Sequence, residues 1–203
     1  MKILCIGRNY AEHIAELNNE RPSEPVIFLK PDTAILKDNE PFYHPDFSND
    51  VHHEVELVLK INKVGKNIEA KFAHKYYDEI GIGIDFTARD LQAKLKEKGL
   101  PWEKAKAFNG SAPISNFISK SQFADLKNVN FHLEINGEVR QKGNTKMMLW
   151  HFDEIIAEIS KYFTLKTGDL VFTGTPAGVG KVNIGDKLTA FIEGQEMLAF
   201  EIK

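Results

Sequence analysis

The chain is poor in cysteine and has no long apolar segment. Cys5 is the only cysteine in 203 residues, which excludes an internal disulfide and a metal cage built of thiolates. A transmembrane helix needs an apolar run of roughly 18 residues, and none is present. The opening sequence MKILCIGRNY also lacks the apolar run of about 7–15 residues that is typical of a secretory signal. We therefore expect a cytoplasmic protein that does not bind a membrane.

The chain also has no excess of positive charge. Lysine and arginine together number 26 against 29 aspartates and glutamates, which gives a net charge of -3, and the basic residues form no stripe. Nucleic acid is therefore not an expected partner. A small anionic substrate remains compatible with this composition, because the charge of one site can oppose the net charge of the chain.

The sequence has no internal repeat and no low-complexity tract. Its one linker-like stretch, Asn18–Pro25, is polar and interrupted by proline, but it lies too near the start of the chain to separate two domains. A chain of this length suits one ordinary domain. We therefore expect a single domain over residues 1–203.

Short apolar segments bounded by Gly, Asn, Asp or Pro predict a protein built mainly of strands. Asn136-Gly137, between two such segments, predicts a hairpin turn. Helical patterns are fewer and do not alternate regularly with the strands, so the fold class is α+β, mainly β, and not a doubly wound sheet. The predicted strands are Lys2–Ile6, Val26–Leu29, Glu54–Ile61, Ile82–Phe86, Val129–Ile135, Leu170–Thr173, Lys187–Ile192 and Met197–Ile202. The predicted helices are Tyr10–Leu17, Ala70–Tyr76, Ala88–Lys98 and Phe152–Phe163.

Two glutamates on one predicted strand are the first candidates for chemistry. Side chains alternate along a strand, so Glu54 and Glu56 share one face while Val55 and Leu57 point to the other. Two carboxylates roughly 7 Å apart on a face that also carries Val58 resist burial unless a cation neutralises them. The alternative is the solvated polar face of an amphipathic strand, and the Glu-x-Glu pattern alone favours that alternative.

A third carboxylate, Asp85, favours a cation site over the solvated strand face. It follows the apolar segment Gly81–Ile84, whose glycines permit close approach of the backbone. Asp85 is not needed as a helix cap, because Thr87 can cap the helix that follows. Three carboxylates without a Cys or an obvious His ligand suit Mg²⁺, Mn²⁺ or Ca²⁺ and disfavour Zn²⁺.

Two pairs of residues at helical spacing could act on a ligand of such a cation. Arg89 and Gln92 share a helix face near Asp85, and an arginine fork suits a substrate carboxylate, although an exposed arginine is about as common. His13 and Glu16 also lie three residues apart, and a carboxylate beside an imidazole favours a general base. The alternative for this second pair is a solvated His–Glu pair, which the pair alone favours.

Two further features are less specific. Lys106 lies among aromatic and small residues and could place a cation near a developing oxyanion, although a surface lysine is the commoner case. Residues 173–180 (TGTPAGVG) form a Gly-rich loop after a strand, which can offer N–H groups and the hydroxyl of Thr175 to an anion. The loop lacks the Gly-Lys-Thr of a phosphate-binding loop, so nucleotide binding is disfavoured.

Taken in order, these residues resemble the fumarylacetoacetate hydrolase superfamily, and more narrowly its short acylpyruvase-like members. The matching stretches are Gly7-Arg8-Asn9-Tyr10, Phe28-Leu29-Lys30-Pro31, His52-His53-Glu54-Val55-Glu56-Leu57, Asp85-Phe86-Thr87-Ala88-Arg89-Asp90, Gly99-Leu100-Pro101-Trp102 with Lys106, and Thr173-Gly174-Thr175-Pro176. They extend over residues 7–176, and together they are highly specific.

The resemblance implies a mixed β-sandwich roll of the fumarylacetoacetate hydrolase C-terminal-domain type, with few short helices, and a homodimer. It implies that the whole chain is one catalytic domain whose first 24 residues include a mobile helix and a linker. The implied metal ligands are Glu54, Glu56 and Asp85, the implied catalytic dyad is His13 and Glu16, and the implied substrate contacts are Arg89, Gln92, Lys106 and Thr175.

The expected reaction is metal-dependent hydrolysis of the C–C bond of a small 2,4-dioxo acid, an acylpyruvate or fumarylpyruvate. His13, held by Glu16, would activate the water, and Lys106 would stabilise the pyruvate enolate that leaves. Two alternatives use the same metal site without water, namely oxaloacetate decarboxylation or tautomerisation and isomerisation of 2-hydroxyhepta-2,4-diene-1,7-dioate. A third alternative is a β module that binds a cation for structure only.

Overall fold

The computed structural model describes residues 1–16 and 20–203, and its largest sheet has six strands. β1 and β12 pair in parallel, whereas the other neighbouring pairs of this sheet are antiparallel. It follows that β1, β12 and β6 end, and β5 begins, at the same edge of the sheet. The strands, in spatial order, are β2 (Val26–Lys30), β1 (Ile3–Gly7), β12 (Leu170–Phe172), β5 (Val55–Ile61), β6 (Tyr77–Ile84) and β9 (Ile118–Ser119).

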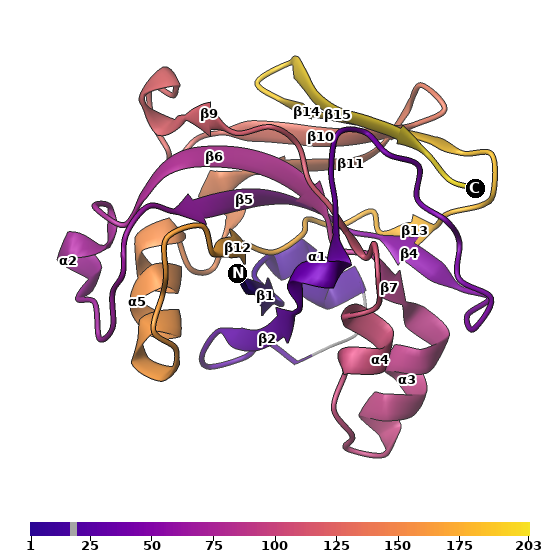
Figure 1. Ribbon diagram of the computed structural model, residues 1–203, viewed down its shortest axis with the longest axis horizontal. Coiled ribbons are helices and arrows are strands. Elements are labelled where there is room, and N and C mark those ends of the chain that lie inside the picture. The colour runs from indigo at the N-terminus through magenta and orange to yellow at the C-terminus, as the bar shows by residue number, and fades with distance from the viewer. Residues whose placement is uncertain (17–19) are drawn as a thin grey trace.

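A second, antiparallel sheet covers one face of the first (Figure 1). Its strands, in spatial order, are β11 (Glu138–Asn144), β10 (Asn130–Ile135), β14 (Lys187–Ile192) and β15 (Gln195–Glu201). The hairpin between β10 and β11 turns at Asn136-Gly137, where both residues have positive φ, as the sequence predicted. The main apolar core lies between the sheets and includes Leu57 of β5, Leu133 of β10 and Leu188 of β14.

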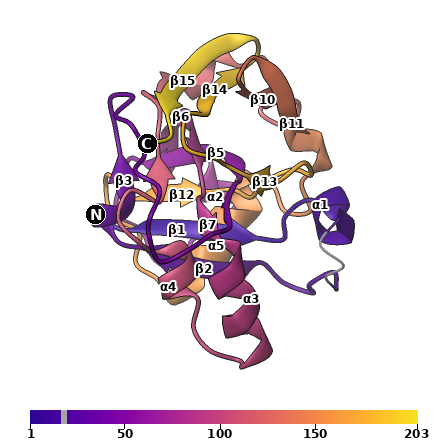
Figure 2. The same ribbon diagram turned by 90° about the vertical axis from the view of Figure 1, so that its right-hand side faces the viewer.

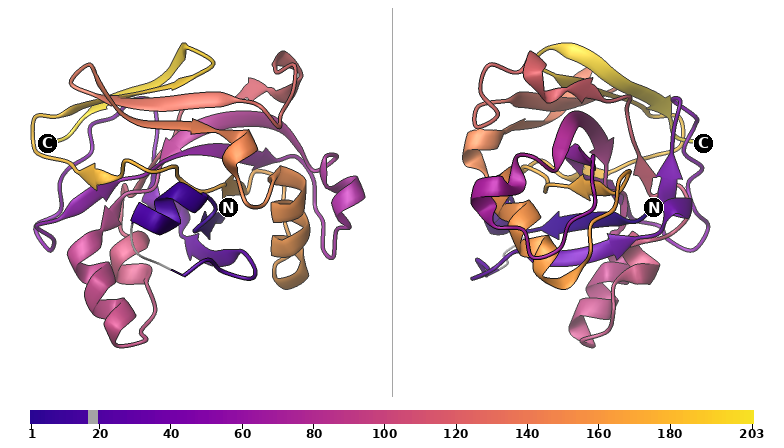
Figure 3. Two further views of the ribbon diagram at one scale, coloured as in Figure 1. Left: turned by 180° about the vertical axis from the view of Figure 1, so that it is seen from behind. Right: turned by 60° about the vertical axis from the view of Figure 1, so that its left-hand side comes forward.

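Short elements complete the fold. The small sheets are β13 (Gly180–Lys181), β4 (Val51–His53) and β7 (Thr87–Ala88), and β3 (Ile35–Leu36) with β8 (Ala112–Pro113). The α-helices are α1 (Ala11–Glu16), α2 (Ala70–Ala73), α3 (Arg89–Glu97), α4 (Glu103–Lys106) and α5 (Phe152–Tyr162), and the 3-10 helices are η1 (Asp32–Ala34), η2 (Lys120–Gln122) and η3 (Thr145–Met147). Figures 2 and 3 show α5 and the pair α3 and α4 on the side away from the second sheet, with α5 at one end and the pair at the other.

The fold class α+β, mainly β, is confirmed, and each predicted strand has a counterpart. The alternation predicted around Glu54 and Glu56 is confirmed as well. Val55 and Leu57 belong to the core between the sheets, whereas Val58, on the glutamate face, packs in a second apolar cluster. Because β5 is buried on both faces, Glu56 is surrounded by protein and the solvated polar face is excluded.

Several predicted boundaries are wrong. α3 begins at Arg89, because Thr87 and Ala88 pair with β4, so Thr87 does not cap the helix and its hydroxyl donates to the carbonyl of Asp85 instead. α2 ends at Ala73, after which the chain turns and the N–H of Tyr76 donates to the Ala73 carbonyl. The short helix α4 was not predicted, and β11 was predicted only as the second strand of the hairpin at Asn136-Gly137, without bounds.

The predicted N-terminal helix is α1 over residues 11–16. Leu17, Asn18 and the next residue, which belonged to the predicted helix and linker, lie outside the described residues. None of the helices in the described part of the chain is long and apolar enough to cross a membrane.

Asn9 joins three segments behind the edge where β1 and β12 end. Its side-chain NH₂ donates to the carbonyls of Thr173 (2.8 Å) and Trp150 (3.0 Å), and its side-chain oxygen accepts from the N–H of Trp150 at 2.9 Å. Asn9 is fully buried, so these backbone groups have no access to water in its place. This side chain therefore fixes the loop that follows β12 relative to the loop that follows β1.

Replacing this side chain should destabilise the fold. Asn9→Ala leaves buried backbone groups of Thr173 and Trp150 without partners, and we expect the free energy of unfolding to fall by about 2–3 kcal/mol. Urea denaturation measures the loss. Asn116→Ala, at an exposed position, is the control and should change stability by no more than about 0.5 kcal/mol. Equal losses in the two variants would contradict a bracing role for Asn9.

Candidate metal centre and ligand cavity

One cavity of about 200 Å³ collects the predicted site residues from distant parts of the chain. Among those residues, Glu16 alone does not line it. The cavity opens at the sheet edge where β1, β12 and β6 end and β5 begins. The predicted residues that line it are His13, Glu54, Glu56, Asp85, Arg89, Gln92, Lys106 and Thr175.

Strand pairing brings the three carboxylates together. Val55 of β5 faces Ile84 of β6, and the N–H of Asp85 donates to the carbonyl of Glu54 at 2.8 Å. One carboxylate oxygen from each of Glu54, Glu56 and Asp85 lies within 4.8 Å of the other two, and all three residues are buried. Oxygens on opposite sides of one Mg²⁺ or Ca²⁺ ion are about 4–5 Å apart, given metal–oxygen distances of about 2.0–2.6 Å. The donor set therefore suits a hard divalent cation.

Buried cations surround two of the three carboxylates. Lys106 donates to Glu54 (2.9 Å) and to Asp85 (2.6 Å), Lys30 lies 2.8 Å from the other Asp85 oxygen, and Arg89 pairs with Glu54. Burial alone would lower the pKa of Lys106, but the charges of Asp85 and Glu54 outweigh it and raise that pKa above its ordinary value. Lys106 is 3% exposed, so the surface-lysine alternative is wrong.

Glu56 is in a different electrostatic environment. Its Oε2 accepts a hydrogen bond from the N–H of Gly174 at 2.7 Å, and among the described residues no cationic side chain is in ion-pair contact with it. Burial raises the pKa of Glu56, and the charges of Asp85 and Glu54 raise it further. Gly174 has a φ of +102°, and a Cβ there would lie 2.6 Å from that of Asn9, so this N–H donor requires glycine. A divalent cation bound here would supply the positive partner that Glu56 lacks among the described residues.

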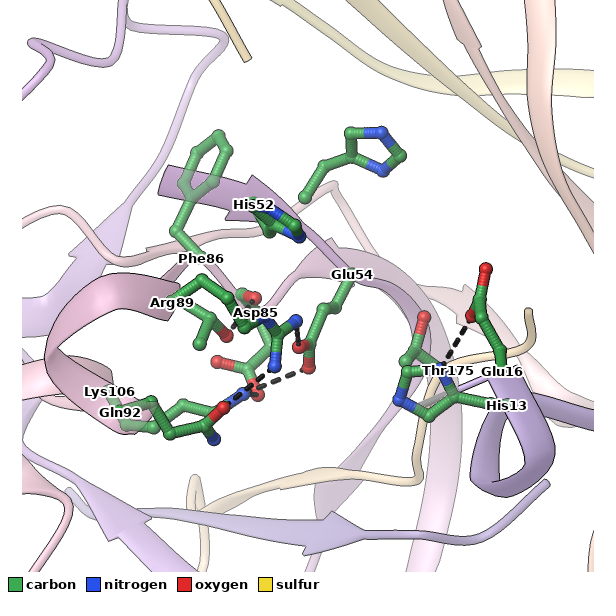
Figure 4. A network of polar contacts seen from close by, with 12 residues as sticks. His13, Glu16, His52, Glu54, Asp85, Phe86, Arg89, Gln92, Lys106 and Thr175 are labelled. Carbon is green, nitrogen blue, oxygen red and sulfur yellow. Dashed lines mark hydrogen bonds and ion pairs between the residues drawn. The ribbon is translucent and has the colours of Figure 1, made fainter. Parts of the chain in front are cut away.

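His13 and Glu16 form a hydrogen-bonded pair at the cavity wall. Nδ1 of His13 lies 3.1 Å from Oε2 of Glu16, whose Oε1 accepts from the N–H of Gly178 at 2.9 Å. His13 is 6% exposed, so a fully solvated pair is excluded. Figure 4 shows His13 and Thr175 across an open space from Glu54, Asp85 and Arg89. With Nδ1 held by Glu16, Nε2 is the ring atom left for a ligand.

Arg89 and Gln92 of α3 are also in direct contact. Nη1 of Arg89 donates to the side-chain oxygen of Gln92 at 2.7 Å, and Gln92 is 8% exposed. The predicted helix face is therefore present, and a freely exposed arginine is excluded because Arg89 also pairs with Glu54.

Gln141, which the sequence reasoning missed, determines how Thr175 can bond. The Gln141 amide donates to the Thr175 hydroxyl (2.8 Å) and the Pro176 carbonyl (2.9 Å), and its oxygen accepts from the N–H of Val55 and from Nδ1 of His53 (both 3.0 Å). The orientation of the amide is unambiguous, because Val55 N–H can only donate and the Pro176 carbonyl can only accept. The Thr175 oxygen is thus an acceptor, and its hydrogen donates to no described residue and is left for a ligand.

Lys30 and Gln141 were not predicted as site residues, and the sequence signals that could have identified them differ. Lys30 ends an apolar strand directly before Pro31, and a lysine in such a place suggests a buried ion pair. Gln141 lies in the charged segment EVRQKGN, where no local pattern distinguishes it. Its position is set by the pairing of β11 with β10 in the second sheet.

The raised pKa of Glu56 predicts how the metal-free protein responds to pH. The folded state binds this proton more tightly than the unfolded state does, so stability falls as pH rises above about 4.3, the value of an unperturbed glutamate, towards the folded pKa. Glu56→Gln stays neutral and should remove this loss, raising the melting temperature of the metal-free protein at neutral pH. It should also abolish the stabilisation that Mg²⁺ gives the wild type.

Thermal melts at several pH values, with Mg²⁺ and with chelator, measure both effects. Glu138→Gln changes an exposed glutamate outside the cavity and is the matched control. If Glu56→Gln melted like that control under every condition, the placement of Glu56 in a cation site would be wrong.

A second prediction concerns the bond between Gln141 and Thr175. In Gln141→Glu the new carboxylate can only accept, so the Thr175 hydroxyl turns its hydrogen away from the cavity. We expect this variant and Thr175→Val each to weaken the binding of oxalate, a planar dianion, to the Mg²⁺-loaded protein by roughly tenfold, equivalent to about 1.4 kcal/mol. The double variant should be no weaker than either, and Thr175→Ser should bind like the wild type. Calorimetric titration measures the affinities, and additive losses would show that the two residues act separately.

Comparison with known proteins agrees with this geometry. The family model described as the C-terminal part of fumarylacetoacetate (FAA) hydrolase matches residues 2–203. Oxaloacetate tautomerase YcgM of Escherichia coli (strain K12) is 44% identical over 197 residues, 97% of this chain and 90% of that protein. The mitochondrial oxaloacetate decarboxylase of Dictyostelium discoideum is 44% identical over 194 residues, 95% of this chain and 89% of that protein.

A solved structure is also closely similar. Fumarylpyruvate hydrolase from Pseudomonas aeruginosa, in complex with Mn²⁺ and pyruvate, superposes with a TM-score of 0.94 at 35% identity, covering 100% of this chain and 89% of that one. The mixed β-sandwich roll expected from the resemblance is thereby confirmed. This chain belongs to the fumarylacetoacetate hydrolase family.

Proposed function

We propose that this chain is a metal-dependent oxaloacetate tautomerase, which interconverts the enol and keto forms of that dicarboxylic acid. The observation that carries the proposal is that His13 lies across a small cavity from the buried carboxylates Glu54 and Asp85, with which Glu56 forms one group. Relatives 44% identical over nearly the whole chain act on oxaloacetate by name, which favours this alternative over the hydrolysis expected first.

The charges of the site support a dianionic substrate. Three buried carboxylates are accompanied by three cationic side chains, those of Lys30, Lys106 and Arg89, which cancel their charge when all are ionised. A divalent cation then leaves an excess of two positive charges among these groups. A dianion such as oxaloacetate restores neutrality, which a neutral or cationic ligand would not do.

Glu54, Glu56 and Asp85 are the proposed ligands of Mg²⁺, with Mn²⁺ or Ca²⁺ as substitutes. When bound, the ion would supply a Lewis acid that polarises the 2-oxo group and orients the substrate. Arg89 with Gln92 would orient the substrate carboxylate, and Thr175 would donate its hydroxyl hydrogen to the same ligand. Lys106, whose raised pKa keeps it protonated, would place a fixed positive charge near the oxygen at C2.

His13 would move the proton at C3. In the direction from enol to keto, Nε2 of His13 delivers a proton to C3, the C2–C3 double bond becomes single, and the hydroxyl at C2 releases its proton to water. In the opposite direction Nε2 removes the proton from C3. Glu16 holds Nδ1 and so fixes which nitrogen faces the substrate.

Hydrolysis of an acylpyruvate or fumarylpyruvate is the second candidate. The same Nε2 could activate a water, which tautomerisation does not consume, and the Pseudomonas aeruginosa structure is named a fumarylpyruvate hydrolase. Decarboxylation of oxaloacetate and the diene-dioate isomerisation are further alternatives that would use the same residues. A purely structural cation site is disfavoured, because a base and a cavity would serve no purpose there.

Several other expectations stay predictions. They are the homodimer, the cytoplasmic location, the single domain and the lid over residues 10–24. The contact of Glu16 with the N–H of Gly178 offers such a lid a defined closed position.

His13→Ala tests the proposed base. We expect it to lower kcat/KM for oxaloacetate tautomerisation by roughly 10²–10⁴, because a positioned general base contributes about that factor. The affinity for Mg²⁺-oxalate should stay close to that of the wild type, because oxalate has no C3 proton to transfer. Loss of the enol absorbance measures the rate, and Glu12→Gln, on the exposed side of α1, is the control.

The same assay is run with acetylpyruvate and fumarylpyruvate in the presence of Mg²⁺. A wild-type enzyme that hydrolyses either of these faster than it tautomerises oxaloacetate would replace the first candidate by the second. A His13→Ala enzyme with the wild-type tautomerase rate would remove His13 from the mechanism.

A further inference from the structure

Two buried side-chain nitrogens have no hydrogen-bond partner among the described residues, and the proposed chemistry uses neither atom. They are Nε of Arg89 and Nδ1 of His52. Arg89 lines the cavity, whereas His52 does not. A buried donor or acceptor without a partner costs about 1–3 kcal/mol, so such atoms are rare in folded proteins.

The pairing of β4 with β7 brings these two side chains to one face of a small sheet. His52 faces Thr87 in this antiparallel pair, and the N–H of Arg89 donates to the carbonyl of Asp50 at 2.8 Å, beyond the end of β7. Facing and alternate residues of antiparallel strands share a face, so His52 and Arg89 are diagonal neighbours within reach of long side chains. Figure 4 shows them next to each other, and the charge of Arg89 is, after burial, the next cause that lowers the pKa of His52. The two nitrogens therefore belong to adjacent side chains.

Asp50 determines which nitrogen of His52 is the acceptor. Nε2 of His52 lies 3.0 Å from Oδ1 of Asp50, and a carboxylate oxygen can only accept, so Nε2 carries the hydrogen. In the neutral ring Nδ1 has no hydrogen and accepts, whereas Nε of Arg89 can only donate. One hydrogen bond between them, direct or through a water, would therefore satisfy both atoms.

The guanidinium of Arg89 has two other contacts, and one of them competes with the proposed cation. Nη1 donates to Gln92 on the same helix at 2.7 Å, and Nη2 pairs with Glu54. Glu54 is also a proposed ligand of the divalent ion, whose charge would attract the glutamate oxygens and repel Arg89. A contact at Nε would hold Arg89 from outside the cavity and leave hydrogens on Nη1 and Nη2 for a carboxylate.

We propose that His52 is a positioning residue for Arg89. Nδ1 of His52 accepts the hydrogen of Arg89 Nε, directly or through one water, and Asp50 holds the ring in the tautomer that this bond requires. The guanidinium thereby stays in position for the substrate carboxylate when Glu54 binds the cation. This role rests on the proposed function, because it assumes that Arg89 orients the substrate carboxylate beside a bound ion.

The test measures the binding of oxalate to the Mg²⁺-loaded protein by calorimetric titration. Oxalate resembles the carboxylate and 2-oxo group of the substrate and undergoes no proton transfer. His52→Phe keeps a planar ring and removes the acceptor, whereas His52→Asn supplies an oxygen acceptor the same number of bonds from Cα as Nδ1. His132→Phe is the matched control, because His132 also pairs with a carboxylate two residues away on a strand, that of Glu134, and does not line the cavity.

We expect His52→Phe to weaken oxalate binding about five- to tenfold, and His52→Asn and His132→Phe to stay within about twofold of the wild type. In an Arg89→Lys background, where a carbon replaces Nε, His52→Phe should cause no further loss, because the bond between the two side chains is already absent. The KM for oxaloacetate should rise in His52→Phe while kcat changes less. The affinity for Mg²⁺ alone should not fall, because Glu54 stays in place.

Four results would overturn this role. They are wild-type oxalate affinity in His52→Phe, equal losses in His52→Asn and His52→Phe, a full further loss in the Arg89→Lys background, and a fall in Mg²⁺ affinity as large as the fall in oxalate affinity. The last result would show that the substitution distorts Glu54. The outcome is separable from that of the proposed function. If His52 and Arg89 are coupled in oxalate binding but the wild type does not tautomerise oxaloacetate, the positioning role stands and the assigned reaction is wrong.

Discussion

Three carboxylates buried at the start of β5 and the end of β6 impose the constraint on which the rest of this structure depends. Glu54, Glu56 and Asp85 are each at most 5% exposed, and isolated charges in such a place would be expelled or neutralised. The buried side chains of Lys106 and Lys30 form ion pairs with these carboxylates, and α4 and β2 place the two lysines at that edge of the sheet. Among the described residues, Glu56 has the N–H of Gly174 as its hydrogen-bond partner and no cationic side chain in ion-pair contact, so its charge is the one that a bound cation would neutralise.

The opposite wall of the cavity is held together by polar side chains that bond to a loop distant from them in the chain. Asn9 fixes the loop after β12 to the loop after β1, and Gln141 reaches from the second sheet to the same loop. Glu16 then anchors α1 to this loop through Gly178. His13 and Thr175 are thereby positioned opposite the carboxylates by hydrogen bonds from the side chains of Asn9, Gln141 and Glu16 to this loop. The site therefore depends on the second sheet, although Thr175 and the carboxylates belong to the first sheet and its loops.

One arrangement of this kind supports several reactions. A cation that polarises a 2-oxo group makes proton transfer at C3 easier, and tautomerisation, decarboxylation and C–C hydrolysis all pass through that polarised state. The residues around the cation cannot by themselves select one of them. Selection depends on what the outer cavity admits and on whether His13 faces a carbon or a water.

Local patterns in the sequence determined the elements and their faces. The alternation from Glu54 to Leu59 correctly placed Val55 and Leu57 in one apolar core and the glutamates on the other face, because the period of a strand is fixed by backbone geometry. The spacing of His13 and Glu16 correctly predicted a contact within one helical turn. Predictions of this kind succeed when the interacting residues are neighbours along one element.

Contacts between segments far apart in the chain were decided by the tertiary structure alone. Lys30 reaches Asp85, Gln141 reaches Thr175 and the N–H of Gly178 reaches Glu16, over 162 residues in the last case, and no local pattern encodes such pairs. The resemblance to a family supplied the set of site residues, but not which cation neutralises which carboxylate. That was settled by the order of strands in the sheets, because register and pairing place charges within contact distance and thereby fix which of them share a proton, a metal or a substrate.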